Sequence, residues 1–364
     1  MRNLKILLLI TALVLTALML PAQTLKESRR LIRSYKLTPQ QIVEITNKFG
    51  KVEVINWEKD SVRIVINFEM TAKTQDKIKK LETLLNFNFS VSEYYVRATT
   101  LIGSSGNTIK TEIDNITNAF MTIGAEAVID YTVYLPSANR LKIKNSFGDI
   151  YLGNVRAPLD IDLAHGDLRI ADLSSFSNIE IKFGKASIQY MPEGALNCQF
   201  STISLEKAGK LNLISKSSNV NLSEVSTLEI DSRRDVIELK RVGTIKGKLY
   251  FTKMMVYRFD DDMNMETSFG SLNLEMIDKM FRGIQLKSNY TDITLFFQPG
   301  SSFNFNLTHT DVSFNYPQQM VLNTQLINKD TKQYKTTGVF GDAGESGVKV
   351  IINAVKGSVK ILYR

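Results

Sequence analysis

The feature of the chain that most constrains its fold is a twelve-residue pattern that returns many times. Its clearest copy is LKIKNSFGDIYL, from Leu141 to Leu152. Apolar residues stand at positions one, three, ten and twelve, while an aromatic residue, a glycine and a turn-forming polar residue stand at positions seven, eight and nine. The period-two alternation at both ends predicts two short strands. The middle predicts a tight corner, in which glycine supplies a positive φ and aspartate bonds the backbone.

From Leu141 to Phe303, copies of this pattern recur at roughly twenty residues, an interval that is typical of stacked repeats. No helical pattern separates them, which disfavours a repeat of alternating strands and helices. The copies begin at Val43, Leu141, Leu159, Ile179, Leu211, Leu228, Met263, Ile284, Phe303 and Val350. We therefore predict an all-β fold, a parallel β-solenoid of about ten or eleven coils whose inward side chains stack from coil to coil.

Two segments interrupt the pattern. Residues 57–126 are predicted to form an α+β insertion near the N-terminal end, with a helix over 74–86 and a polar loop over 103–124. Residues 318–346 are predicted to be an irregular loop before the last coil, which we place over 348–363.

The N-terminal residues indicate export. Residues 1–22 have a basic start, an apolar run and a small residue at Ala22, the pattern of a secretory signal peptide that is cut after that alanine. An uncleaved anchor helix is the alternative, although the apolar run is short for a membrane span. Residues 23–364 are then a single solenoid domain in the periplasm, on the outer surface or secreted, with no stable membrane span.

The segment between the signal and the first coil is predicted to be a short helix over 24–35. Thr24 and Glu27 have the spacing of a capping box. We expect this helix to cover the open end of the solenoid, because exposed ends of stacked repeats need a cap.

The charge of the chain limits the class of partner it can bind, and its cysteine content limits the disulfides it can form. The formal net charge is +8, but Lys and Arg are scattered along the chain and no nucleic-acid-binding module is present. Nucleic acid is therefore not the expected partner, whereas weak attraction to an acidic polysaccharide stays open. Cys198 is the only cysteine, so no intramolecular disulfide can form, and its apolar position predicts a buried structural thiol.

The chain offers little material for catalysis. It has two histidines and lacks the GxSxG, HExxH, P-loop and CxxC motifs. The aspartates at position nine, Asp149, Asp167, Asp292 and Asp311, are expected to be turn residues, because the dense tandems of calcium-binding β-rolls are missing. The acidic run Asp260 to Asp262 is expected to be a solvated loop. We therefore predict no catalytic residue, no metal and no cofactor.

Position seven holds the most unusual residues of the pattern. It carries Phe49, Phe147, His165, Phe269, Tyr290 and His309. In a solenoid these side chains would form a ladder along one corner. One interpretation is packing that stabilises the corner; the other is an exposed strip for sugar rings, because aromatic faces suit that contact. The candidate ligand-binding residues are Phe147, His165, Phe269, Tyr290 and His309.

Two stretches, VEITNKFGKVEVINW and YTVYLPSANRLKIKNSFGDIYL, followed by repeated Gly-Asp/Ser-Ile corners, resemble the bacterial β-strand-repeat "putative adhesin" family, which is related to autotransporter-adhesin head domains. The resemblance spans Gln40 to Arg364. It implies a secreted β-solenoid with a role in surface interaction, and it brings no established catalytic residue.

The resulting hypothesis is an exported, non-enzymatic, adhesin-like binding or scaffolding protein of the bacterial envelope, with a glycan or an envelope protein as partner. A carbohydrate-active β-solenoid enzyme, of the lyase or hydrolase type, is the alternative. It requires a groove in which carboxylates converge with an arginine or lysine. A third possibility is a purely structural envelope protein, whose surface would have neither a groove nor an aromatic strip.

Overall fold

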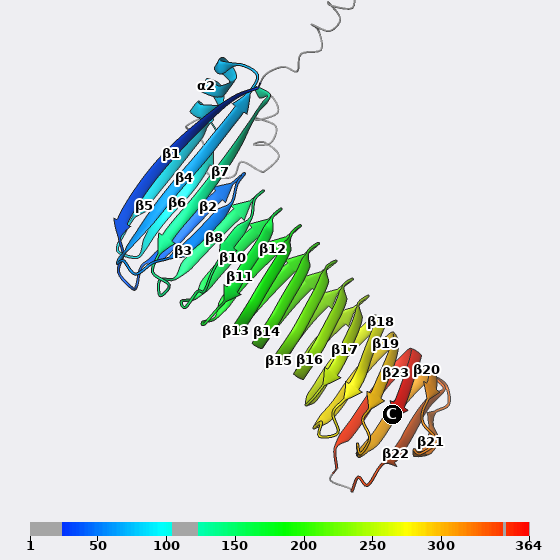
Figure 1. Cartoon of the computed structure of the whole chain (residues 1–364). Helices are drawn as coiled ribbons and strands as arrows, with labels where there is room; N and C mark the ends of the chain where they lie inside the picture. The colour runs from blue at the N-terminus through cyan, green and yellow to red at the C-terminus, as the bar shows by residue number, and fades with distance from the viewer. Residues whose placement is uncertain (1–23, 104–122, 345–346, 364) are drawn as a thin grey trace, which may run out of the picture.

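The fold is all-β and is dominated by one long sheet with mostly parallel strands. The computed structural model describes residues 24–103, 123–344 and 347–363, and within them a single 23-stranded sheet runs the length of a rod (Figure 1). The proposed signal peptide and nearly all of the loop predicted over 103–124 lie outside the described residues. No helix in the described residues is long and apolar enough to cross a membrane.

The regular part of the rod is wound from short strands in two rows. One row holds β8 (Leu141–Ser146), β10 (Leu159–Ala164) and β12 (Ser177–Lys182), and the other holds β9 (Ile150–Leu152) and β11 (Asp167–Asp172). The next strands are longer and bend through both rows; they are β13 (Lys185–Gln199), β14 (Thr202–Lys216), β15 (Asn219–Arg233) and β16 (Val236–Tyr250). The first half of β13 pairs with β11 and its second half with β12, so each coil lies on the one before it.

The predicted inward positions form the core. Leu141, Ile143, Ile150 and Leu152 are buried, and the parallel register places each of them over an apolar residue of the next coil. Lys142 and Lys144, between the apolar positions of β8, are exposed. The alternation therefore sorts side chains as the pattern predicted, and one continuous core joins the coils.

An antiparallel cap closes the N-terminal end of the rod. The first coil, β2 (Ile42–Lys48) and β3 (Val52–Asn56), pairs with β8 and β9 on one side. On the other side it pairs with β6 (Tyr95–Ile102) and β7 (Ala125–Leu135). The remaining strands are antiparallel: β5 (Leu85–Val91) lies on β6, and β4 (Ser61–Ala72) lies between β7 and β1 (Leu25–Lys36). Helix α2 (Gln75–Leu84) confirms the helix expected over 74–86, and it buries Ile78 and Leu81.

The helix predicted over 24–35 is wrong. These residues form β1, which pairs with β4 along its whole length from Leu25 to Lys36. Twelve paired residues supply far more hydrogen bonding than an isolated short helix, which is marginal in water. The capping-box spacing of Thr24 and Glu27 is therefore overridden by sheet pairing. β1 still covers the end of the rod, and its charged side chains suit an exposed edge strand.

The C-terminal end departs from chain order. The strands that follow β16 are β17 (Lys253–Phe259), β18 (Asp262–Ile277), β19 (Gly283–Phe297), β20 (Phe303–Asn315), β21 (Val321–Asn328), β22 (Gln333–Phe340) and β23 (Lys349–Tyr363). β23 lies between β19 and β20 and is parallel to both (Figure 1). Residues 318–346 were expected to be irregular; instead they contain β21 and β22, which extend the sheet antiparallel beyond β20. The last strand of the chain is therefore held on both edges.

The continuous core gives a direct test of the fold. Replacing Ile143 or Ile293 with Asp should lower the free energy of unfolding by more than about 3 kcal/mol, because an unpaired carboxylate would enter a site with no exposed surface. Urea unfolding followed by circular dichroism measures this change.

Ser187→Asp is the matched control, since Ser187 is exposed and lies in register with Arg169. It should change stability by less than about 0.5 kcal/mol. Equal unfolding curves for Ile143→Asp and the wild type would contradict the inward placement of this position.

Candidate functional site

Every coil turns its corner on a residue in the left-handed backbone conformation. The φ angles of these residues lie between 49° and 60°. They are Phe49, Phe147, His165, Phe183, Phe200, Ser217, Arg234, Phe251, Phe269, Tyr290, Lys356 and Asp311. A non-glycine residue in this region is uncommon, so its return at each corner shows that the coil geometry demands it. We refer to these twelve positions as the corner positions.

Backbone hydrogen bonds explain this conformation. The N–H of Phe147 donates to Ala164 O at 2.9 Å, and the N–H of His165 donates to Lys182 O at 2.9 Å. The same bond recurs at Phe200, where the N–H donates to Lys216 O at 3.0 Å. The left-handed residue thus keeps the parallel backbone hydrogen bonds between coils intact while the chain changes direction.

The glycine after the corner position has a role different from the one predicted. Gly148 and Gly166 lack positive φ, but a Cβ on Gly148 would lie 2.0 Å from Gly50 O, and one on Gly166 would lie 2.2 Å from Gly148 O. Glycine is required at these corners because adjacent coils approach too closely for a side chain. The aromatic residue, and not the glycine, supplies the positive φ.

The aromatic corner residues stack in two runs, which together we call the aromatic ladder. The first run is Phe49, Phe147, His165, Phe183 and Phe200, with ring centroids 4.8 to 5.2 Å apart and interplanar angles of 3° to 8°. The second run is Phe251, Phe269 and Tyr290, with centroids 4.9 and 5.1 Å apart. Lys356 Nζ extends the second run and lies 4.8 Å from the Tyr290 ring centroid. Inside each run the ring faces cover one another and leave mainly ring edges toward solvent.

The structure brings four of the five predicted site residues onto this corner. Phe147 and His165 lie in the first run, and Phe269 and Tyr290 lie in the second. His309 lies elsewhere: it pairs with Ala354 inside β20 and stacks on Tyr334 with a centroid distance of 5.7 Å. The corner position of that coil is Asp311, two residues later.

Four ladder residues were not among the predicted site residues: Phe49, which was expected at position seven, and Phe183, Phe200 and Phe251, which were not. The pair Phe183-Gly184 repeats Phe147-Gly148 and could have been found by that signal. Phe200 and Phe251 are followed by Ser201 and Thr252, so the glycine signal is absent there. Only the distance of 17 residues, from Phe183 to Phe200 and from Arg234 to Phe251, marks these two corners in the sequence.

Arginines neutralise the acidic run that breaks the repeat. Asp260 accepts hydrogen bonds from Arg241 and Arg258 at 2.6 and 2.7 Å, and Arg282 pairs with Asp261. Burial raises the pKa of Asp260, but these two guanidinium groups outweigh it and hold that pKa below its usual range. The Arg282 hydrogen bond likewise lowers the pKa of Asp261. In the part of the chain that the structure describes, no group of three or more His, Cys, Asp or Glu residues could hold a metal ion.

The position-nine aspartates and Cys198 have structural contacts. Asp149 Oδ1 accepts a hydrogen bond from the Asp167 N–H at 2.8 Å, and Asp292 Oδ1 accepts one from the Ser358 hydroxyl at 2.6 Å. These carboxylates join neighbouring coils. Cys198 is buried, as predicted, and its burial raises the pKa of the thiol to about 11, which disfavours the thiolate form that a nucleophile needs.

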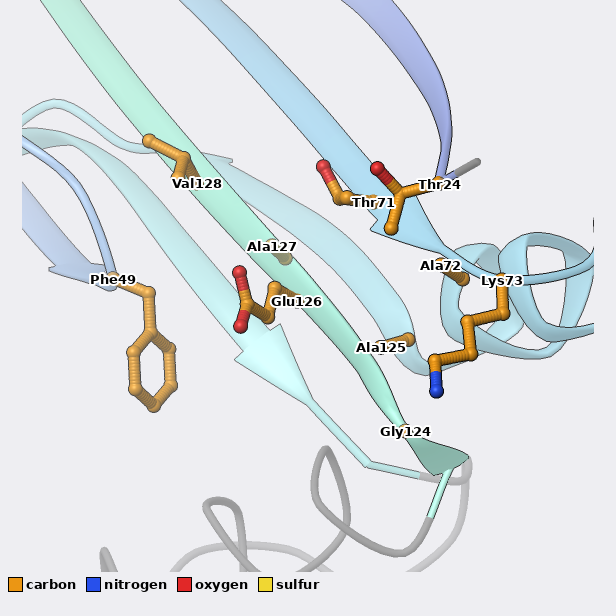
Figure 2. A pocket seen from close by; sticks show the side chains of 10 residues that line it. All are labelled: Thr24, Phe49, Thr71, Ala72, Lys73, Gly124, Ala125, Glu126, Ala127 and Val128. Atoms are coloured by element: carbon orange, nitrogen blue, oxygen red, sulfur yellow. The ribbon is translucent and has the colours of Figure 1, made fainter. Parts of the chain in front are cut away.

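The described surface also has depressions, one at the Phe49 end of the ladder and others away from it. The first, of about 750 Å³, lies beside Phe49, and Figure 2 shows the side chains of Lys73 and Glu126 around it. Its lining is otherwise small or apolar. The second, of about 580 Å³, lies on the outer face of β14 to β17. It is lined by Ser204, Glu206, Asn221, Leu222, Ser223, Glu238, Lys240 and Tyr257.

Comparisons with known proteins found little. No family model and no curated protein matches the chain. A solved "putative cell adhesion protein" from Clostridium sporogenes aligns over 93% of this chain and 100% of its own, at 9% identity and a TM-score of 0.18. A "putative adhesin" from Bacteroides fragilis aligns over 92% and 97%, at 11% identity and a TM-score of 0.20. TM-scores this low do not establish a common fold, so neither name bears on the function of this chain.

The placement of His309 predicts a pH effect on stability. Burial lowers the pKa of His309 below its ordinary value of 6.5. The unfolded chain therefore binds this proton more readily, and the folded state loses stability as the pH falls through 6.5. We expect His309→Gln to reduce the loss of unfolding free energy between about pH 7.5 and 5.5, as measured by urea titration at each pH.

At pH 8 to 9 the imidazole is neutral in both states, so wild type and variant should there show the same pH dependence. An unchanged or steeper loss of stability in the variant on acidification would contradict the assignment.

Proposed function

We propose that the chain is an exported, non-enzymatic, adhesin-like binding protein, built as a β-solenoid of about ten or eleven coils, and that the aromatic ladder is its saccharide-binding surface. This proposal rests mainly on one observation: the ladder is aromatic although the fold does not require aromatic residues at the corner positions. Ser217, Arg234, Lys356 and Asp311 occupy corner positions with the same positive φ as the rings. The backbone therefore accepts a polar residue at this position, and the aromatic residues serve another purpose.

Exposure of the rings supports binding. Phe183 and Phe200 are 51% and 50% exposed, and Phe251 and Tyr290 are both 46% exposed. Each stacked pair contributes about 0.5–1.5 kcal/mol beyond its area burial, so stacking accounts for part of the choice. Two runs of stacked rings with several half-exposed members are nevertheless typical of an interaction surface. Aromatic rings beside polar and charged side chains suit the apolar faces and hydroxyl groups of sugars.

Export rests on the sequence. A signal peptide over 1–22 and a domain over 23–364 give the protein access to envelope or external polysaccharide. Periplasmic, surface and secreted locations all agree with this proposal. An envelope protein that carries glycans would be an equally suitable partner.

The second depression favours one alternative, a carbohydrate-active enzyme. Glu206 and Glu238 lie on the same outer face with Lys240, and two carboxylates flanking a sugar are what glycoside hydrolysis needs. The register places Glu206 and Glu238 two coils and two residues apart, which corresponds to about 12 Å between their Cα atoms. Tyr257, 48% exposed, would offer a ring to the same sugar. The purely structural alternative leaves this depression and the ladder without a role.

A glycan-array screen of residues 23–364 tests the proposal. We expect specific binding, and we expect Phe147→Ala and Tyr290→Ala each to weaken it at least tenfold by interrupting the strip. Phe176→Ala is the matched control, because Phe176 is 52% exposed but lies outside the ladder. Circular dichroism should show that all three variants remain folded.

Retained binding in both ladder variants would contradict the proposed surface. Release of reducing ends from a bound polysaccharide, abolished by Glu206→Gln or Glu238→Gln, would favour the enzyme instead.

A further inference from the structure

The aromatic ladder has an unfilled place in its middle, and we propose that this place is the binding slot for one acidic sugar unit, a uronate, of a polysaccharide. The slot lies over Ser217, between Phe200 and Arg234. This inference rests on the proposed saccharide-binding function and specifies its ligand class and its central contacts.

The gap between the two runs is defined by the corner positions. Phe200 and Phe251 are three coils apart, and Ser217 and Arg234 stand between them. Three coil steps correspond to about 14 Å, against one step between neighbouring rings inside a run. Ser217 carries no ring, so the stacking of aromatic side chains stops at Phe200 and the next coil does not continue it.

The ring faces at this gap differ from all others in the ladder. Phe147, His165, Phe183 and Phe269 each have a ring stacked on both faces. Phe200 stacks on Phe183 alone. Among the described residues no ring or cationic group stacks on its other face, which points toward Ser217. A planar or chair-shaped ring placed there would continue the ladder with the spacing that the protein already uses.

The charge around the slot selects an anion. Lys216, Arg233 and Arg234 lie at or next to the two corner positions, and all three are exposed. None of the three forms an ion pair with a carboxylate of the described residues. The Arg233 guanidinium carbon lies 4.9 Å from the Tyr250 ring centroid, which holds this charge beside the gap. Two cations farther along β14 and β16 are paired, Lys210 with Glu193 and Lys246 with Glu229.

Two carboxylates lie close to the slot. Asp231 is exposed on β15, two residues before Arg233, whereas Asp235 lies at the corner and is hydrogen-bonded. Asp235 is 2% exposed; its Oδ1 accepts from the Ser218 N–H at 2.7 Å, and its Oδ2 accepts from the Ser232 hydroxyl at 2.5 Å and the Arg233 N–H at 3.0 Å. This carboxylate joins two neighbouring coils beneath the corner. It leaves the surface charge of the slot positive.

The combination favours a uronate over other anionic rings. Single-stranded nucleic acid stacks successive bases on successive platforms, whereas this ladder offers one open slot flanked by closed runs. A uronate ring brings an apolar face for Phe200, a carboxylate for Arg234 or Lys216, and hydroxyl groups for Ser217 and Asn219. Arg234 would close the slot from the opposite side, since a guanidinium stacks on flat groups and pairs with carboxylates.

The first test fills the proposed slot with an aromatic side chain introduced at position 217. Ser217→Phe places phenylalanine at a corner position where Phe already occurs with the same φ, so the variant should fold and melt at an equal or higher temperature. Isothermal titration calorimetry with a uronate tetrasaccharide should show binding by the wild type that is at least tenfold weaker in Ser217→Phe. Phe176→Ala, which removes an exposed ring outside the ladder, should bind like the wild type.

A second variant keeps the proposal testable if Ser217→Phe does not fold. Arg234→Gln changes an exposed side chain and should weaken uronate binding at least fivefold, with a smaller dependence on salt. The methyl ester of the same tetrasaccharide should bind the wild type as weakly as the acid binds Arg234→Gln.

The outcomes separate this inference from the proposed function. Equal affinity of wild type and Ser217→Phe overturns the slot, even if Phe147→Ala still abolishes glycan binding and so supports the ladder. If the folded wild type does not bind the uronate tetrasaccharide, the slot proposal is also overturned. Binding of neutral glycans on the array then still tests whether the ladder binds saccharides. Tighter binding of an oligonucleotide than of the uronate would assign the slot to nucleic acid and reject the sugar.

Discussion

The structure depends on a hydrogen bond that each coil makes to the next at its corner. At Phe147, His165 and Phe200, for example, the N–H of the left-handed corner residue donates to a carbonyl of the following coil. That conformation costs roughly 1–2 kcal/mol per residue, and it is repeated at twelve described positions. It persists because the bond maintains the parallel register on which the apolar columns stack. The core and the ladder are therefore two results of one corner geometry.

The periodicity of the sequence predicted the buried positions and the strands. Strand pairings between segments far apart in the chain could not be predicted from it. Alternating apolar positions such as Ile143 placed the core and the mostly parallel sheet, because burial on one face leaves a period of two in the sequence. β1 was mistaken for a helix, because its pairing with β4 is a tertiary contact without a local signal. The insertion of β23 between β19 and β20 is likewise invisible in chain order.

The candidate site was predictable in part. Phe147, His165, Phe269 and Tyr290 were placed on one corner because each has the glycine or turn residue that marks it. Phe200 carries the ring face at the proposed slot, yet neither Phe200 nor Phe251 has that mark, so this part of the ladder could not be predicted from the sequence. His309 was misplaced by two residues, because the coil of β20 turns at Asp311.

Fluorine NMR would test the ladder as a binding surface most directly. The protein would be labelled with fluorophenylalanine, its signals assigned by single substitutions, and the uronate tetrasaccharide or the strongest array glycan titrated in. The account predicts shifts at the exposed rings of Phe200 and Phe251 and none at the buried rings of Phe259, Phe281 and Phe303. Saturable binding that leaves every ladder signal unmoved would contradict the central claim and move the binding surface elsewhere on the solenoid.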